Sequence, residues 1–296
     1  MDKIINLSYI LTTKNRLPFL KIALQKLLDN LQPDEEVVVV DAQSTDGTQA
    51  YLAQLFEAGK IHQYLSEPDR NQAHGWNKAM LMAKGILIKK IIDDDVFCYS
   101  AIQQCKAYML QNPQVDVVIA NDMSSLLNNH QTIHQHTRLN EFQKWRSGQV
   151  PSFTFGDVHM LIRQSALTYT GLYSTTFTMM DWEFSLRMSY LKTNIAYYTG
   201  YNALTVAHPQ SVTSQVNQQR LAEEGKLGAM LYQYHGDNSA ISHWSKIKVF
   251  IGNIVFKKRL AGKLGKAVTE DITLIYQHYY QHLQHINNAG NFIFIN

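Results

Sequence analysis

The sequence predicts an α/β fold in which helices flank a mainly parallel β-sheet, with a helical extension toward the C-terminus. Three observations support this prediction. Short apolar runs alternate with helical patterns through the first hundred residues, which is typical of strands joined by crossover helices. Hydrophobic residues make up 45% of the 296 residues, which is enough apolar material for a large core. After about Val212 the pattern becomes helical and polar.

The first half of the predicted sheet contains four strand segments. Residues 4–11, 61–65 and 86–92 are short apolar runs. Residues 36–40 include four consecutive valines, a pattern that suits a strand covered on both faces. All four segments are therefore expected inside one buried sheet.

Helices are predicted between these strands. Asn15 is the expected N-cap of the first helix, and Pro18 lies in its first turn. A second helix is expected over residues 48–58. A third is expected over residues 73–83, and we predict that it stops at Gly85.

The later elements are a helix over residues 101–112, a strand over 115–120 and a helix over 181–191. Asp181 lies in the first turn of the last of these, where a carboxylate suits the helix dipole. Residues 244–266 mix apolar side chains with lysine and arginine.

Composition excludes several classes of protein. A net charge of +3 is too small to indicate a nucleic-acid partner. Two cysteines cannot form a disulfide-rich scaffold or a cysteine-rich zinc module. The N-terminal sequence lacks the pattern of a signal peptide, and no run of about 18 apolar residues occurs. We therefore predict a cytoplasmic protein, with contact to the inner face of the membrane left open.

Polar side chains follow three of the predicted strands. Thr12 follows the first strand, Asp41 the second and Asp93-Asp94-Asp95 the fourth. Ligands of parallel sheets bind beyond the carboxyl ends of the strands, so these residues are expected on one rim.

The triple aspartate is the strongest local signal. Three adjacent carboxylates repel one another, and a cation offsets that repulsion. Mg²⁺ and Mn²⁺ prefer carboxylate oxygens and also bind phosphate, so a diphosphate could share a metal ion here. The alternative is a solvated acidic turn.

The other candidate residues each have a structural alternative. Asp41 could accept a hydrogen bond from a base or a ribose, or it could cap a turn. Asp181 or Glu183 could act as a general base, or both could be ordinary N-terminal helix acids. His208 could contact a metal or phosphate, or it could be a structural histidine.

Taken together, four segments resemble the family 2 glycosyltransferases, which have the GT-A fold. The segments are LSYILTTKNR at 7–16, VVDAQSTDGT at 39–48, the set SEPDR, WNKA and DDD at 66–70, 76–79 and 93–95, and DWEFSLR at 181–187. They are similar to the family's opening strand and turn, its V-D-x-x-S-T-D-G-T, its S-E-x-D followed by D-x-D, and its E-D-W-D-L-x-x-R helix. The resemblance covers about the first 210 residues.

The resemblance implies a role for each matching residue. It implies that Asp181 is the catalytic base. Asp95 would be the main metal ligand, with Asp93 and with His208 of an H-P-x-S element nearby, and the ion would be Mn²⁺ or Mg²⁺. The implied nucleotide-binding residues are Thr12, Asn15, Arg16, Asp41, Asp69, Arg70, Asn77, Asp93 and Asp94.

The same resemblance implies a division of the chain. Residues 1–214 would form the glycosyltransferase domain, with a nucleotide-binding half over 1–100 and an acceptor half over 101–214. Residues 215–296 would form a C-terminal helical region. Acceptor-contacting loops are expected between Asn121 and Phe155.

Two departures from the family pattern concern the site. Met180 stands where the family has the glutamate of its E-D pair, and Ala42-Gln43 replaces commoner acidic or glycine residues. Support for the base and contacts to the nucleotide can therefore differ.

The function that the resemblance implies is inverting transfer of a sugar, from a UDP-sugar in the first instance, to a carbohydrate or lipid-linked acceptor in the synthesis of bacterial-type surface polysaccharide or glycoconjugate. One alternative is a sugar nucleotidyltransferase, although Thr12 to Arg16 lacks the glycines of a triphosphate loop. A second is an inactive carbohydrate- or nucleotide-binding scaffold of the same fold. Residues 244–266 could rest on an anionic membrane or cover the core. The oligomeric state is left open.

Overall fold

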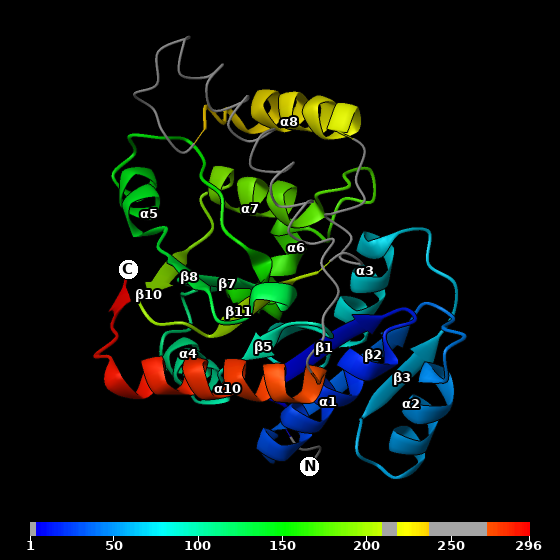
Figure 1. Cartoon of the computed structure of the whole chain (residues 1–296). Helices are drawn as coiled ribbons and strands as arrows, with labels where there is room; N and C mark the ends of the chain where they lie inside the picture. Colours follow the sequence, from blue (N-terminus) through cyan, green and yellow to red (C-terminus); the bar gives the residue numbers. More distant parts are fainter. Residues whose placement is uncertain (1–3, 209–217, 237–270) are drawn as a thin grey trace.

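Two β-sheets and their surrounding helices form the structure, a computed structural model that describes residues 4–208, 218–236 and 271–296 (Figure 1). Within these residues the larger sheet has eight strands in the order β12-β10-β6-β9-β4-β1-β2-β3, and the smaller has four in the order β5-β11-β7-β8. The strands are β1 (Leu7–Thr13), β2 (Glu35–Asp41), β3 (Gln63–Ser66), β4 (Leu87–Ile92), β5 (Val96–Phe97), β6 (Val117–Ala120), β7 (Asp122–Leu126), β8 (Ile133–His136), β9 (Met160–Arg163), β10 (Ile195–Tyr198), β11 (Ala203–Ala207) and β12 (Phe294–Ile295).

Helices cover both faces of the larger sheet (Figure 1). The helices are α1 (Leu17–Asn30), α2 (Thr48–Glu57), α3 (Gln72–Met82), α4 (Tyr99–Gln111), α5 (Leu139–Arg146), α6 (Leu167–Thr170), α7 (Met180–Tyr190), α8 (Gln218–Tyr232) and α10 (Ile272–Ala289), with short 3₁₀ turns η1 (Leu127–Asn129), η2 (Asp157–His159) and η3 (Gln164–Ala166). Side chains of α1, α2, α4 and α10 join the core on one face, and those of α3, α5 and α7 join it on the other.

Most strand pairs of the larger sheet are parallel, which confirms the predicted fold class. β1 pairs in parallel with both β2 and β4, β2 with β3, and β6 with β10. Strand β9 runs antiparallel between β4 and β6, and β12 runs antiparallel to β10. In the register, Thr13 lies opposite Asp41 and Thr12 lies opposite Ile92. The ends of β1, β2 and β4 therefore meet at one edge.

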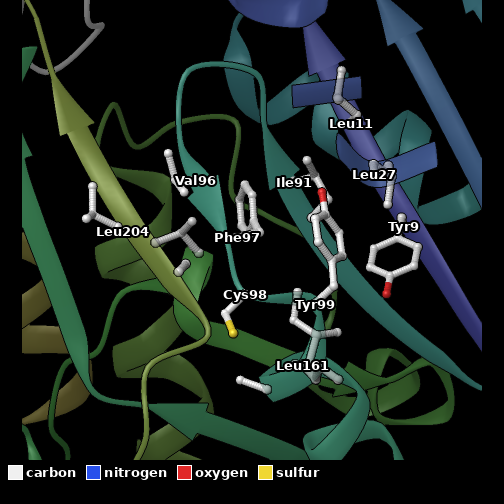
Figure 2. Close-up of a cluster of buried hydrophobic side chains, with 14 of the residues drawn as sticks. Tyr9, Leu11, Leu27, Ile91, Val96, Phe97, Cys98, Tyr99, Leu161 and Leu204 are labelled. Carbon is white, nitrogen blue, oxygen red and sulfur yellow. The ribbon is translucent and has the colours of Figure 1, made fainter. Parts of the chain in front are cut away.

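The valine run of β2 places alternate side chains on opposite faces, as the period of two in a strand requires. Val37 and Val39 belong to one buried cluster, while Val38 and Val40 belong to the other. Figure 2 shows part of the first cluster, in which Phe97 lies close to Ile91. The prediction of a strand covered on both faces is confirmed.

The start of α1 differs from the prediction. Arg16, not Asn15, is the N-cap residue, and its side chain makes no capping hydrogen bond. Asp46 Oδ2 instead accepts a hydrogen bond from the Leu17 N–H at 3.0 Å. Asn15 instead adopts a left-handed conformation, with φ of 53°. Asparagine tolerates this conformation better than most residues because its short polar side chain can bond locally. The Asn15 side chain accepts a hydrogen bond from the Thr45 backbone N–H at 2.7 Å, so it joins two loops.

The end of α3 also differs from the prediction. The helix ends at Met82, and Ala83 is already extended, so Gly85 does not terminate it. Gly85 has a different reason to be glycine. A Cβ there would lie 2.5 Å from the Ser8 backbone nitrogen and 2.8 Å from the Leu7 carbonyl carbon. The two chain segments can approach this closely only without a side chain.

We expect Gly85→Ala to lower the free energy of unfolding by about 1–3 kcal/mol, because the added methyl group forces backbone apart. Gly225→Ala in α8 is the control, since a Cβ there meets nothing within 4 Å. That change should leave stability equal or raise it by about 0.5–1 kcal/mol. Urea denaturation measures both. Equal stability of Gly85→Ala and the wild type would contradict the close approach.

Candidate active site

The carboxyl ends of β1, β2 and β4 form the first part of the site. Thr13 Oγ1 donates a hydrogen bond to Asp93 Oδ2 at 2.7 Å. Asp41 is fully buried and accepts hydrogen bonds from Ser44 N at 3.1 Å, from Ser44 Oγ and from Ser66 Oγ at 2.7 Å. The structure thus places Asp41 as a turn cap, and its contact with a nucleotide base stays a prediction.

The turn of three aspartates is buried, with exposed fractions of 2–5%. Such carboxylates need a cation nearby, and the chain itself supplies one. The Arg16 guanidinium pairs with Asp94 and lies 3.5 Å from Asp93 Oδ1. Burial, together with the charge of Asp94, raises the pKa of Asp93 to about 7, although Arg16 acts in the opposite direction.

Two later segments hold the same turn. His208 Nε2 lies 2.7 Å from Asp94 Oδ2, and the His208 ring stacks on Phe19 at 4.9 Å between centroids. Asp95 Oδ1 accepts a hydrogen bond from the Val206 backbone N–H at 2.8 Å. The Tyr276 hydroxyl, from α10, donates to the Asp94 carbonyl oxygen. Residues far apart in sequence therefore fix the conformation of the acidic turn.

The segment from β3 to α3 provides the second group of predicted residues. Asp69 pairs with Lys78 at 2.7 Å, and it packs so closely on α3 that a Cβ at Gly75 would lie 2.3 Å from Asp69 Oδ2. Arg70 is exposed. Asn77 makes a reciprocal pair of hydrogen bonds with the backbone of Tyr173, both at 2.9 Å. Asn77 therefore braces the loop before α7, and a contact with the nucleotide stays a prediction.

A buried lysine lies at the centre of the third group, and sequence reasoning missed it. Lys90 Nζ forms a salt bridge of 2.6 Å with Asp157 Oδ2, which also accepts a hydrogen bond from the Tyr173 hydroxyl at 2.6 Å. The ammonium lies 4.4 Å from the centroid of the Trp76 ring. Two consecutive lysines within the apolar run of β4 were the available signal, because a charge in a buried strand needs a partner.

Lys90 also connects the acidic turn with Asp181. Burial raises the pKa of the Asp181 carboxyl, the charge of Asp157 raises it further, and Lys90 lowers it. Lys90 lowers the pKa of Asp95 as well, although burial and Asp94 raise it well above the ordinary value. One buried cation thus acts on both carboxyls, which are 86 residues apart in the sequence.

Glu183 has a different environment from Asp181. Both of its carboxyl oxygens bond to Arg187 at 2.9 Å, and one also accepts from the Tyr232 hydroxyl. A carboxylate held this way is a structural anchor, so of the two predicted candidates Asp181 is the better placed to accept a proton.

A cavity of about 370 Å³ lies in the region predicted to contact an acceptor. Its lining residues are Asp122, His136, Thr137, Arg138 and Glu141. They come from β7, the end of β8, the two residues that join β8 to α5, and the start of α5. Residues 244–266, predicted to contact a membrane or cover the core, lie outside the described residues. Within the residues described, none of the helices combines the length and hydropathy needed to cross a bilayer.

The donor atoms available to a divalent ion are carboxylate oxygens, which Mg²⁺ and Mn²⁺ prefer. In the described part of the chain, no three His, Cys, Asp or Glu side chains converge on one metal position. An ion shared with a diphosphate needs only one or two protein carboxylates. Asp95 and Asp93 therefore fit such a shared ion, whereas an all-protein metal cage is not formed by these residues.

The fold that holds this site is the GT-A fold. The model of glycosyl transferase family 2 matches residues 8–170, and the chain belongs to this family. Its family gives the chain a role in glycosyl transfer. No curated protein sequence matches the chain.

Solved glycosyltransferase structures share the fold. Residues 1–349 of TarS from S. aureus, in complex with UDP-GlcNAc, match with a TM-score of 0.60 and 16% identity, over 88% of this chain and 71% of that one. The mannosyltransferase PcManGT from Pyrobaculum calidifontis, in complex with GDP-Man and Mn²⁺, matches with a TM-score of 0.55 and 15% identity, over 93% and 87% of the two chains.

Proposed function

We propose that the chain transfers a sugar from a nucleoside diphosphate donor to an acceptor hydroxyl with inversion at the anomeric carbon. The observation that carries this proposal is the position of Lys90, whose charge acts on Asp95 of the acidic turn and on Asp181 of α7. In this proposal a donor bound at the turn lies near Asp181, the carboxylate that accepts the proton.

In this proposal Asp181 takes the proton of the acceptor hydroxyl as the oxygen attacks the anomeric carbon. The new glycosidic bond forms on the face opposite the bond that breaks, and the electron pair of the broken bond leaves with the diphosphate. Asp157 holds Lys90 in place by their 2.6 Å salt bridge, so the positive charge stays beside the developing negative charge.

The nucleotide is proposed to be UDP. The TarS structure with UDP-GlcNAc supports this choice, while the mannosyltransferase structure with GDP-Man keeps GDP as the second candidate. The donor would bind within residues 1–100 and the acceptor within 101–214, with residues 215–296 as the C-terminal region.

We propose Mn²⁺ or Mg²⁺ as the cofactor, held by Asp95 with Asp93. Such an ion, when bound, neutralises the charge that builds on the leaving diphosphate. Arg16 and His208 both contact Asp94, so they would keep this carboxylate oriented while its neighbours bind the ion.

The acceptor is proposed to be a carbohydrate or a lipid-linked carbohydrate, used in the synthesis of surface polysaccharide or glycoconjugate. The cavity between β7, β8 and α5 supports a polar acceptor, because its carboxylate, imidazole and guanidinium groups can bond hydroxyls.

A cytoplasmic location, with contact between residues 244–266 and an anionic membrane surface, completes the proposal. Flotation with anionic vesicles at low salt tests that contact, and absence of binding would remove it.

A sugar nucleotidyltransferase is the less favoured function, because the β1–α1 turn lacks the glycines of a triphosphate loop. An inactive scaffold is also less favoured, because Asp93, Asp95 and Asp181 are all present. Incubation with UDP-GlcNAc or GDP-mannose separates these functions. Release of UDP or GDP supports sugar transfer. Pyrophosphate release from a nucleoside triphosphate would support the first alternative, and no reaction of the folded protein would support the second.

Metal-dependent nucleotide binding gives a direct test of the acidic turn. Asp95→Asn keeps an oxygen for the Val206 N–H but removes the negative charge. The ratio of UDP affinity with Mn²⁺ to UDP affinity without it describes the metal dependence. We expect this ratio to fall by about 10–100-fold or more in the variant, because a metal ligand is weakened. Calorimetry with UDP, with and without Mn²⁺, measures it. Binding that responds neither to the metal nor to the substitution would contradict the assignment.

A further inference from the structure

Helix α8 touches the chain on both sides of Asp181, although it follows about 40 residues later. We propose that Glu224 of α8 is a positioning residue that fixes Asp181 in its working orientation. This inference rests on the proposed role of Asp181 as the base. Glu224 itself lies outside every motif that the sequence analysis singled out.

The Glu224 carboxylate binds the loop that leads into α7. It accepts hydrogen bonds from the Thr178 backbone N–H at 2.8 Å, the Thr178 hydroxyl at 2.7 Å and the Met179 N–H at 3.3 Å. Arg220, one turn earlier on α8, donates to it at 2.8 Å. The Glu224 side chain is largely buried, with 10% of its surface exposed.

The start of α7 depends on this carboxylate. Met179 is the N-cap residue, and its side chain makes no capping hydrogen bond. The first N–H groups of a helix have no partner within the helix, and a negative charge stabilises that end. Glu224 supplies both a hydrogen-bond acceptor and the charge, and its contacts end two residues before Asp181.

Two further contacts of α8 lie immediately after Asp181. The Trp182 ring packs against α8 at Gly228, where a Cβ would lie 2.4 Å from Trp182 Cζ3. The Tyr232 hydroxyl donates to Glu183. Helix α7 lies directly below α8 in Figure 1, and the two helices are in contact. Helix α8 thus holds Thr178 and Met179 before the base and Trp182 and Glu183 after it.

A base must lie within hydrogen-bond reach of its proton, and a displacement of about 1 Å can cost roughly 100-fold in rate. The contacts of Glu224 reach the backbone before Asp181 and not the donor-binding turn. Loosening them should therefore lower kcat and leave the KM for the nucleotide sugar unchanged.

Glu224→Gln tests this. The amide keeps the size of the side chain but replaces one acceptor oxygen with a donor. Each Glu224 oxygen accepts two hydrogen bonds, so the full set cannot be kept. We expect kcat to fall by about 10–100-fold with unchanged KM, because the base is displaced while the donor site is not. Turnover of UDP-GlcNAc and GDP-mannose is followed by nucleotide release, and kcat is divided by the concentration of sites that bind UDP.

Three variants serve as controls. Glu223→Gln makes the same change at the exposed neighbouring position and should keep wild-type kcat. Thr178→Val removes the hydroxyl that donates to Glu224 and should lower kcat. Thr178→Ser keeps the hydroxyl and should have a kcat close to that of the wild type. These substitutions separate an effect on the base from a general loss of stability.

Wild-type kcat per binding site in Glu224→Gln, or a higher KM alone, would overturn the inference. If that variant does not fold, Thr178→Val and Gly228→Ala decide in the same way. Asp181→Asn is assayed in parallel. Turnover retained in Asp181→Asn would contradict the proposed function. If Asp181→Asn is inactive but Glu224→Gln is fully active, only the inference about Glu224 is wrong.

Discussion

Asp181→Asn is expected to lower kcat by about 10²–10⁴-fold, because the amide cannot accept the proton of the acceptor hydroxyl. Affinity for UDP should stay close to that of the wild type, since the nucleotide is proposed to bind at the ends of β1, β2 and β4. Initial rates with UDP-GlcNAc and calorimetry with UDP measure the two effects. Asp29→Asn, an exposed change of the same kind on α1, is the control. A near wild-type rate in Asp181→Asn would exclude Asp181 as the base.

The pH dependence of kcat should report the environment of Asp181. Burial and the charge of Asp157 raise the pKa of its carboxyl above the ordinary value for aspartate. A base works only when deprotonated, so the rate falls as the pH decreases through this raised pKa. The acidic limb of the wild-type profile should therefore lie above the range of an exposed aspartate.

Lys90→Met should have the largest effect on stability. Removing one partner of a buried salt bridge leaves the Asp157 charge uncompensated, which costs about 3–5 kcal/mol. Because Lys90 lowers the pKa of Asp181, its loss should raise that pKa and move the acidic limb of kcat to higher pH. Urea denaturation and the pH profile of nucleotide release measure the two effects.

Two further variants control for this change. Lys84→Met alters an exposed lysine just before β4. It should change neither the free energy of unfolding nor the position of the acidic limb of kcat. Lys90→Met combined with Asp157→Asn removes both buried charges and should recover much of the lost stability. An acidic limb that stays in place in Lys90→Met would show that Lys90 and Asp181 are not coupled.

The order of elements in the first hundred residues could be predicted from the sequence because each strand there is a short apolar run. In β2 the four valines face two separate clusters, so burial on both faces was readable from composition alone. The acidic turn could be located for a related reason. Charged residues that directly follow a buried strand must lie at its end, where Asp93, Asp94 and Asp95 are found.

Partners from distant segments could not be predicted. Nothing in the local sequence pairs Lys90 with Asp157, because β9 inserts between β4 and β6 in the antiparallel direction and brings the preceding turn beside β4. The same limit applies to Asn77, whose motif position indicated a ligand contact while the structure gives both ends of its amide to Tyr173. Capping of the α7 loop by Glu224 likewise depends on helix packing rather than on spacing.

The bond from the Tyr276 hydroxyl to the Asp94 carbonyl joins α10 to a turn made 182 residues earlier. During synthesis on the ribosome, the α/β first half can begin to collapse while α10 is still untranslated. The acidic turn would then be left without one of its supports until residues 271–289 have emerged. A nascent chain should accordingly acquire the final conformation of its acidic turn late, well after most of its central sheet has formed.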